Sequence, residues 1–475
     1  MWFKSRSAND KYMPIGRYNP IGEERKMQKN KTDSQAKTTR IILSAIVLAA
    51  VTAVSFFAGY FLRDVTNPEM ASLRFIVEKY KKYYLEESDD FVSVMGNSII
   101  DRYSEYMTKE EYEAVVKSAA GRRKGIGISY NKDTLAISSV KGNSPAEKAG
   151  IAEGDVMTGL KKSGEENFAD IKDYEQLAAL FDTISDEELF SLRLSSGGNE
   201  KICELSFRDY QEAYVFYNDN SGDYRFSDDN GGDLSLKLYK EGNSALAADT
   251  AYIKYTGFNG RGGDSKVNSS SWQMKVALQK FKDNKKSKLI LDLRNNGGGY
   301  MDILENIAAH FIDCEHGSEK LVSKAVYKDE SESKFYSSSV DYSDYGFEKI
   351  VILVNTGTAS ASEALIGAML DYDTNGKVSV VLSASAGSKS VENASPEEIV
   401  YRSYGKGIMQ TTYVNPLGGD AIKLTTAKIY WPVSDLSIHG VGVCKSALGI
   451  YADRIYEPTY ESGIDYELKK AISLM

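Results

Sequence analysis

The chain has 475 residues, of which 42% are hydrophobic and 11% aromatic with only 8 prolines, so a disordered or collagen-like chain is excluded and two or more domains are expected. The formal net charge is -9, although the first 40 residues carry ten Lys or Arg against four Asp or Glu, so the remainder is strongly acidic and a poor candidate for nucleic-acid binding. The three cysteines are far apart in the sequence and predict neither a disulfide framework nor a metal site: Cys203, Cys314 and Cys444. The chain has only three histidines, His310, His316 and His439, which limits any mechanism that needs a His base or a His-rich metal site.

A membrane segment is predicted near the N-terminus. Residues 41–62 contain 22 residues without a charge, and as a helix they would span ~33 Å, enough for a hydrocarbon core of ~30 Å. The basic residues precede this segment, so residues 1–40 are expected to be a cytoplasmic tail and the rest to lie outside the cytoplasm. A cleaved signal peptide is the alternative, but the apolar stretch is too long for one and no A-x-A site follows it before Asn67.

The residues after the predicted membrane segment fall into regions with different sequence patterns. Apolar spacing typical of one helical face predicts an N-terminal helical segment over 68–118, and short alternating runs with Gly and Ser turns predict a β-rich domain over 121–207. A polar stretch over 218–232 is expected to be a loop. Within 208–475, apolar strands, tight turns and helical patterns then repeat, which predicts an α/β core.

Ser360 is a candidate nucleophile. It stands between an apolar run that ends near Val354 and a segment with helical spacing, so it is expected at a helix N-terminus. Backbone N–H groups and the helix dipole favour developing negative charge there, which acyl transfer requires. Ser360 or Ser362 could equally be an ordinary N-cap.

Two further motifs supply the rest of a possible site. The glycine run 297–299 follows another strand, where it either approaches a substrate oxyanion or simply makes a turn. Lys406 stands between two glycines with Gln410 four residues on, and a buried Lys with a depressed pKa can replace His as the base for a serine nucleophile. Gly-Lys-Gly by itself is more often an exposed loop.

Together these motifs resemble the C-terminal processing peptidases, or tail-specific proteases, a family of serine peptidases with a PDZ domain. The resemblance covers most of residues 70–450 and rests on these segments: Arg102 to Thr108, Asp292 to Gly299, Asn355 to Glu363, Gly405 to Gln410 and Leu424 to Ala427. It implies that Ser360 is the nucleophile, Lys406 the general base and Gln410 the residue that orients Lys406. It also implies an oxyanion hole from the N–H groups of Gly298 and Ala361. The implied fold is a crotonase-like α/β core with a β-rich cap.

Three departures from the family pattern concern these assignments. Lys406 lies further from Ser360 than is usual, and the excess is a polar stretch over 383–402, which a surface insertion would explain at little cost. Lys389 is the rival base by spacing, but it lacks flanking glycines and a Gln four residues on. Gly297 stands where proline is usual, and Cys444 begins a Cys-Lys where Pro-Asp is common.

The β-rich domain at 121–207 resembles a PDZ domain through Gly125-Ile126-Gly127-Ile128 and the segment from Asn143 to Val156. PDZ domains capture a peptide C-terminus in a backbone loop while the peptide adds as a strand. The four residues Gly125, Ile126, Gly127 and Ile128 are therefore candidate peptide contacts, although both isoleucines could also be ordinary core.

We therefore expect a serine endopeptidase anchored in the cell membrane by one helix, with its catalytic part outside the cytoplasm and protein substrates recognised by exposed C-terminal tails. No metal, cofactor or nucleic acid is expected, and a homo-oligomer is compatible with the sequence. A catalytically inactive PDZ scaffold is the first alternative, kept open by the insertion and by Gly297. A crotonase-like acyl-CoA enzyme is the second, and export disfavours it.

Overall fold

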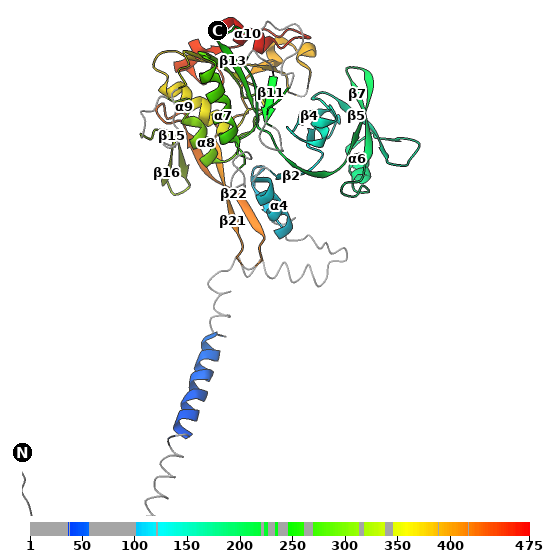
Figure 1. Cartoon of the computed structure of the whole chain (residues 1–475). Helices are drawn as coiled ribbons and strands as arrows, with labels where there is room; N and C mark the ends of the chain where they lie inside the picture. Colours follow the sequence, from blue (N-terminus) through cyan, green and yellow to red (C-terminus); the bar gives the residue numbers. More distant parts are fainter. Residues whose placement is uncertain are drawn as a thin grey trace, which may run out of the picture. The chain divides into compact units, whose positions relative to one another are not determined.

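The computed structural model describes residues 37, 39–56, 101–119, 122–219, 223–226, 233–235, 246–260, 269–312, 318–337, 345–387, 389–416 and 418–475 (Figure 1). The chain divides into two compact units, Met1–Phe91 and Val92–Met475. Cys314, His316, most of the basic tail and residues 68–100 of the expected helical segment lie outside the described residues.

In the first unit, one helix covers Thr39–Phe56, 18 residues with a mean hydropathy of 2.0 and side chains exposed along its length. This length and composition suit a membrane span, and a signal sequence would have the same properties. Residues 57–62 of the expected span lie outside the described residues.

The second unit is built on an eight-stranded sheet. Its order is β12 (Asp233–Ser235), β11 (Asp223–Phe226), β10 (Val215–Asn218), β13 (Thr250–Tyr255), β14 (Lys288–Asp292), β17 (Lys349–Val354), β18 (Val378–Leu382) and β23 (Ile455–Tyr456). From β13 to β23 the neighbouring strands are parallel. The predicted α/β core is thus confirmed, whereas the loop expected over 218–232 contains strand β11, which pairs with β10.

Helices cover both faces of this sheet (Figure 1). Helices α7 (Ser270–Asp283), α8 (Met301–Ala308) and α9 (Ala361–Tyr372) share one hydrophobic cluster with alternate residues of the strands. Helix α10 (Tyr466–Leu474) packs on the intervening residues at the other face. Successive strand residues point to opposite faces, which is why these strands are continuously apolar.

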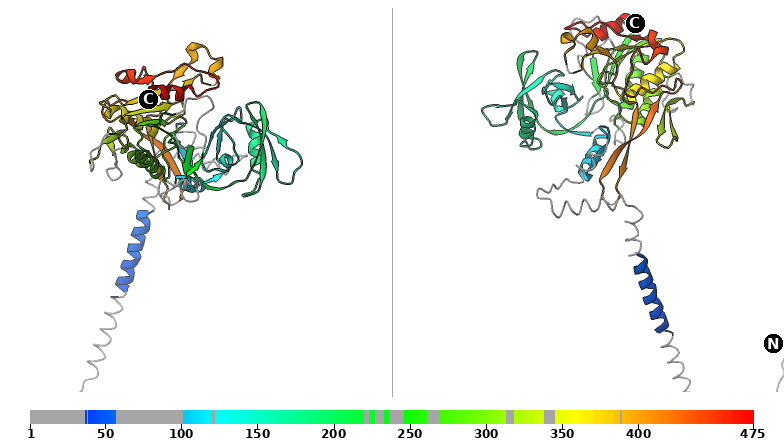
Figure 2. Two further views of the ribbon diagram at one scale, coloured as in Figure 1. Left: turned by 45° about the horizontal axis from the view of Figure 1, so that its top comes forward. Right: turned by 180° about the vertical axis from the view of Figure 1, so that it is seen from behind.

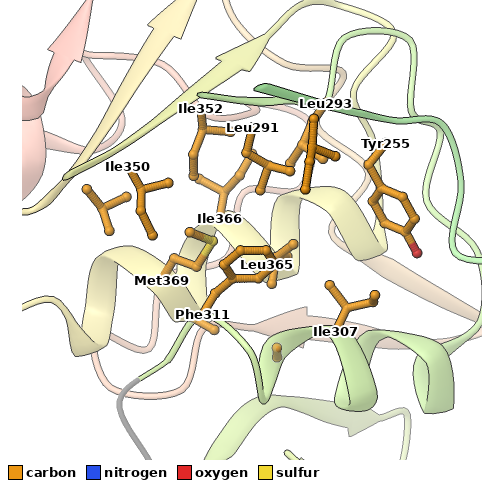
Figure 3. Packing of buried hydrophobic residues seen from close by; sticks show 14 of the residues in the cluster. Tyr255, Leu291, Leu293, Ile307, Phe311, Ile350, Ile352, Leu365, Ile366 and Met369 are labelled. Carbon is orange, nitrogen blue, oxygen red and sulfur yellow. The ribbon is translucent and has the colours of Figure 1, made fainter. Parts of the chain in front are cut away.

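Helix α9 is fixed by this packing (Figure 3). Leu365 and Met369 on the helix pack with Ile350 and Ile352 of β17, and all four side chains are almost fully buried. Burial of each such side chain contributes ~1.5–3 kcal/mol. The start of α9 is therefore held firmly at the carboxyl end of β17.

A second sheet follows the order β1 (Glu105–Met107), β22 (Ala421–Tyr430), β15 (Leu321–Tyr327) and β16 (Glu332–Tyr336), with β21 (Ile408–Val414) also paired to β22. Figure 2 shows β21 and β22 as a long orange hairpin. Within the expected helical segment, residues 105–107 therefore form a strand, because their backbone pairs with residues 421–423. Helix α4 (Lys109–Ala119) follows this strand.

Residues 122–211 form a β-rich module with its own hydrophobic cluster. Its elements are β2 (Arg122–Gly125), β3 (Ile128–Tyr130), β4 (Ile137–Val140), α5 (Pro145–Lys148), β5 (Val156–Lys162), β6 (Ala169–Asp170), α6 (Tyr174–Phe181), β7 (Phe190–Ser196), β8 (Asn199–Leu205) and β9 (Arg208–Gln211). Strand β9 pairs with β2 and closes the module four residues beyond the expected boundary of 207.

The polar stretch at 383–402 forms a small structure of its own. Strands β19 (Ala384–Ser385) and β20 (Val400–Tyr401) pair and enclose two 3₁₀ turns, Val391–Asn393 and Pro396–Glu398. A further 3₁₀ turn covers Gly449–Arg454. The excess length before Lys406 is thus taken up by a compact local excursion after β18.

Candidate active site

Ser360 occupies the turn between β17 and α9 in a strained conformation. Its φ is +59° and its ψ is -118°, whereas a residue with a side chain rarely has a positive φ. Such a conformation costs on the order of 1–3 kcal/mol and persists only where surrounding contacts enforce it. Thr358 supplies one of these contacts, because its hydroxyl donates to the carbonyl oxygen of Leu293 at 2.8 Å.

Gly298 lies directly against this turn. Its φ is +95°, and a Cβ there would lie 2.8 Å from Ser360 Cβ, 2.8 Å from Ala361 N and 2.7 Å from the Ala359 carbonyl oxygen. Glycine is therefore required both by conformation and by space. The arrangement brings Gly298 next to the first N–H groups of α9, which have no acceptor within the helix.

The Gly298 N–H is already engaged in this structure. It donates to Asn296 Oδ1 at 3.0 Å, and the Asn296 amide nitrogen in turn donates to the Tyr255 carbonyl oxygen at 2.9 Å. Asn296 is fully buried. An oxyanion at this position would have to share the Gly298 N–H with Asn296 or replace it, a feature that the glycine pattern alone did not reveal.

Lys406 stands just before β21 and is half-buried. Burial lowers the pKa of its amine, and the nearby charge of Lys423 lowers it further, while Tyr103, Glu363 and Asp101 act in the opposite direction. Its Nζ lies 5.5 Å from the centre of the Tyr103 ring. A lysine in this environment is more readily neutral near pH 7 than one in water.

Gln410 follows a bulge in β21, between Met409 and Gln410. Its amide nitrogen donates to Thr425 Oγ1 at 3.4 Å, a long hydrogen bond to the neighbouring strand β22. Thr425 on β22 thus orients the Gln410 side chain, and Lys423 lies on the same strand as Thr425.

One cleft of about 1070 Å³ brings the five predicted site residues together: Gly298, Ser360, Ala361, Lys406 and Gln410. The rival base Lys389 is not part of this lining. Its side chain is 54% exposed and pairs with Glu398 within the insertion. The geometry therefore favours Lys406 over Lys389.

Glu363 was missed by the sequence reasoning. Its carboxylate is fully buried and accepts hydrogen bonds from Ser360 N at 2.9 Å, Gly405 N at 2.8 Å, Lys406 N at 2.9 Å and the Ser403 hydroxyl. Burial raises the pKa of this carboxyl, and the donors, Ser403 first, counteract that shift. One side chain thus joins the Ser360 turn to the Lys406 loop. The sequence contained one signal for this residue, because an acidic residue three positions after a serine is typical of a helix start in which the acid accepts the serine N–H.

Helix α4 forms another part of the cleft that the sequence did not predict. Tyr112, Val115, Val116 and Ala119 line the cleft, and Val115 and Val116 are 45% and 50% exposed. Met409 and Phe335 from the second sheet also line the cleft. The cleft that contains Ser360 therefore has apolar side chains from both α4 and the second sheet.

The β-rich module contains a separate groove of about 360 Å³, lined by Lys124, residues 125–130, Lys141, Phe181 and Tyr210. All four candidate peptide contacts belong to it. Gly125 and Gly127 have positive φ values, +137° and +79°. Ile126 is also almost fully buried in the module's core, whereas Ile128 is half-buried at its margin.

The comparisons with known proteins agree on one family. The profile described as Peptidase family S41 matches residues 249–396. A probable CtpA-like serine protease of Staphylococcus saprophyticus subsp. saprophyticus is 28% identical over 467 residues, which cover 93% of this chain and 78% of that protein. A protein of the same description from Staphylococcus aureus (strain N315) is 27% identical over 421 residues, covering 85% and 70%.

Solved structures give likenesses of the same kind. The photosystem II D1 C-terminal processing protease has a TM-score of 0.46 and 19% identity, covering 77% of this chain and 83% of that one. A putative S41 protease from Bacteroides fragilis NCTC 9343 has a TM-score of 0.47 and 14% identity, covering 82% and 90%.

The chain is a serine-type peptidase. The matched profile and these relatives support the C-terminal processing peptidase family that the sequence motifs resemble.

Proposed function

We propose that this protein is a membrane-anchored serine endopeptidase that uses Ser360 as nucleophile and Lys406 as general base. The observation that carries the proposal is the shared cleft, where a serine with a positive φ at a helix start faces the same space as a half-buried lysine. Strain at a serine and a lowered lysine pKa are both typical of functional sites.

In the proposed reaction, the neutral Lys406 amine takes the Ser360 hydroxyl proton while the Ser360 oxygen forms a bond to the peptide carbonyl carbon. The peptide C–N bond then breaks, and the leaving amine takes the proton from Lys406. Water attacks the resulting ester while Lys406 accepts a proton from it, and the ester C–O bond then breaks as the Ser360 oxygen takes that proton from Lys406, which regenerates the site.

The oxyanion of each tetrahedral intermediate would be stabilised by the N–H groups of Gly298 and Ala361. The close approach of Gly298 to Ala361 supports this pairing. Gln410 would hold the Lys406 amine in position from β21. Glu363 would keep the two halves of the site in register, since it accepts from the backbone of both.

Residues 121–207 would act as a PDZ domain that binds the C-terminal tail of the substrate. The groove over residues 125–130 supports this role, because a glycine-rich loop with positive φ values presents backbone N–H groups to a carboxylate. Lys124 at the rim pairs with Asp186, and its ammonium would have to exchange this partner to contact the carboxylate.

The apolar helix at Thr39–Phe56 supports an anchor in the cell membrane, and the basic residues before it support a cytoplasmic N-terminus with the catalytic part outside the cytoplasm. Substrates would then be extracytoplasmic proteins.

The test uses the full chain in detergent with an unfolded protein that ends in an apolar tail. Ser360→Ala and Lys406→Ala are expected to abolish cleavage, while Lys389→Ala should retain the activity of the unaltered chain. Cleavage that survives Lys406→Ala but not Lys389→Ala would show that the base is misassigned. Blocking the substrate's C-terminal carboxylate as an amide should raise KM if the tail is recognised in the groove.

A further inference from the structure

Tyr103 lies beside the amine of Lys406 although the two residues are far apart in the chain. The Lys406 Nζ is 5.5 Å from the centre of the Tyr103 ring, within the range of a cation–π contact. Tyr103 precedes β1, and Lys406 precedes β21, and both strands pair with β22. A segment from the beginning of the second unit therefore lies beside Lys406, one of the residues that line the cleft with Ser360.

Side chains hold the Tyr103 ring from two directions. Arg102 donates to the Tyr103 hydroxyl at 2.5 Å, and its guanidinium carbon lies 4.7 Å from the ring centre. The Tyr103 hydroxyl donates to the Tyr404 hydroxyl at 3.4 Å, and the two rings meet edge to face at 6.4 Å. Since Tyr404 is two residues before Lys406, the ring is fixed to the same loop that carries the amine.

The backbone around Tyr103 is fixed as well. Asp101 Oδ1 accepts from Tyr103 N at 2.9 Å and from Ser104 N at 2.8 Å. The Ser104 hydroxyl accepts from Thr425 N at 2.9 Å, and Glu105 pairs with Lys423 in β22. These bonds leave the half-buried ring little freedom to swing away from Lys406.

We propose that Tyr103 is a positioning residue for Lys406: its ring covers the amine and keeps water from it, so that the base is complete only when the segment at 101–107 is paired with β22. This inference rests on the proposed role of Lys406 as base. It adds a residue outside the matched peptidase domain at 249–396 to the machinery of the reaction.

The groups around Lys406 have opposing effects on the pKa of its amine. Burial is the largest influence on the Lys406 pKa and lowers it, with Lys423 on β22 acting in the same direction. Tyr103, Glu363 on α9 and Asp101 raise the pKa. Removing the ring admits water and also removes its attraction for the ammonium form. We expect the first effect to prevail and the pKa to rise, because the ring lies beside the amine, 5.5 Å from Nζ to the ring centre.

The experiment measures the pH dependence of kcat/KM for the full chain and for Tyr103→Ala and Tyr103→Leu. The rise of kcat/KM with pH reports deprotonation of the base. Tyr103→Ala should move this rise upward by about one pH unit, which lowers kcat/KM about tenfold at pH 7. Tyr103→Leu keeps an apolar cover without a ring face, so the rise should stay in place or move to lower pH.

A second readout does not depend on activity. In the Ser360→Ala background, the rate at which acetic anhydride modifies Lys406, followed by peptide mass spectrometry, gives the pH midpoint of its amine. Tyr103→Ala should move that midpoint upward by the same amount. Tyr413→Ala is the matched control, because Tyr413 is 53% exposed on β21 and is not part of the cleft lining, and it should change neither quantity.

The outcomes separate the inference from the function on which it rests. Cleavage that survives Lys406→Ala would overturn the proposed base, while the labelling midpoint would still show whether Tyr103 covers the amine. An unchanged midpoint in Tyr103→Ala, or an equal upward shift in Tyr103→Ala and Tyr103→Leu, would overturn the inference. If Tyr103→Ala does not fold, Tyr103→Ser opens the same space with a side chain that is common in turns such as the one formed by residues 101–104, and the same outcomes apply.

Discussion

The carboxylate of Glu363 accepts the backbone N–H of Lys406 at 2.9 Å. The same oxygen, Oε2, accepts the backbone N–H of Ser360 at 2.9 Å, and Oε1 accepts from Gly405 N and the Ser403 hydroxyl. One buried anion therefore joins the nucleophile turn to the base loop, in addition to the backbone hydrogen bond from Tyr404 N to the Thr358 carbonyl oxygen at 2.9 Å.

Glu363→Gln should disable this link while changing the size of the side chain little. One carboxylate oxygen becomes an NH₂ group, which cannot accept, so two of the four donors lose their partner inside the protein. The expected loss of stability is about 1–3 kcal/mol. We expect kcat to fall about a hundredfold, since small misplacements of reacting groups cost that much. Steady-state kinetics and thermal unfolding measure the two effects.

Glu398→Gln is the matched control for this substitution. Glu398 also accepts hydrogen bonds, but it is exposed and belongs to the insertion. It should leave kcat within about twofold and stability within ~0.5 kcal/mol. A Glu363→Gln enzyme with the unaltered kcat would show that the two loops keep their register without this carboxylate.

Gly298→Ala should abolish cleavage. A Cβ at this position would lie 2.7 Å from the Ala359 carbonyl oxygen and 2.8 Å from Ser360 Cβ, and the φ of +95° adds strain. Loss of one oxyanion donor alone costs about a hundredfold to a thousandfold in kcat. Gly297→Ala provides the comparison, because nothing lies within 4 Å of its Cβ position and its φ is not positive. Similar activities of the two variants would argue against an oxyanion role for Gly298.

The parts of the fold that follow from local sequence were predicted well. The strands before Gly297 and Ser360 are continuous apolar runs followed by turn residues, so both the strands and the turns could be identified from the chain alone. Lys406 lines the same cleft as Ser360, and its role as base stays a prediction.

The features that sequence reasoning missed depend on contacts between distant segments. Residues 105–107 have no strand pattern of their own and become a strand by pairing with β22. In the sequence, Glu363 is an ordinary acidic residue in the first turn of a helix. Only the folded structure shows that it accepts hydrogen bonds from Gly405 N and Lys406 N. The hydrogen bond from Gly298 N to Asn296 is likewise invisible in a run of Asn and Gly residues.

Lys406→Met should stabilise the fold while it removes activity. The amine has an ordinary pKa of 10.5 in the unfolded chain and a lower pKa in the folded protein. Between these two values the unfolded chain binds more protons, so stability rises with pH across that window, and below the folded pKa the cost of the buried charge is fully present. Methionine carries no such cost.

Thermal unfolding at pH 7 and at pH 10 tests the direction of this pH dependence of stability. The Tm of Lys406→Met should exceed that of the unaltered chain by about 2 °C at pH 7, and the difference should shrink as the pH approaches 10. Lys389→Met, at an exposed lysine, should show no such dependence. A difference that grows with pH would mean that the folded protein favours the charged amine, which would contradict its role as base.

Arg294 ties the turn that carries Gly298 to the C-terminal helix. Its guanidinium makes two hydrogen bonds of 2.8 Å to the Asp465 carboxylate at the start of α10 and three, of 2.6, 3.0 and 3.1 Å, to Asp292 at the end of β14. The side chains of Arg294 and Asp292 are 18% and 1% exposed. Removal of the cation would leave the buried Asp292 carboxylate with neutral donors only, the Tyr252 hydroxyl at 2.7 Å and the backbone N–H of residue 294 at 2.9 Å.

Arg294→Met should therefore lower the free energy of unfolding by about 3–5 kcal/mol, the usual cost of breaking a buried ion pair from one side. Lys469→Met breaks the exposed pair with Glu461, in which both side chains are 52% exposed, and should cost less than ~1 kcal/mol. Denaturant unfolding of both variants compares these costs directly. Arg294 is only four residues from Gly298. A loss of kcat in Arg294→Met, measured where the variant is fully folded, would therefore show that α10 helps to position the oxyanion turn. An unaltered free energy of unfolding would mean that Asp292 does not need the arginine.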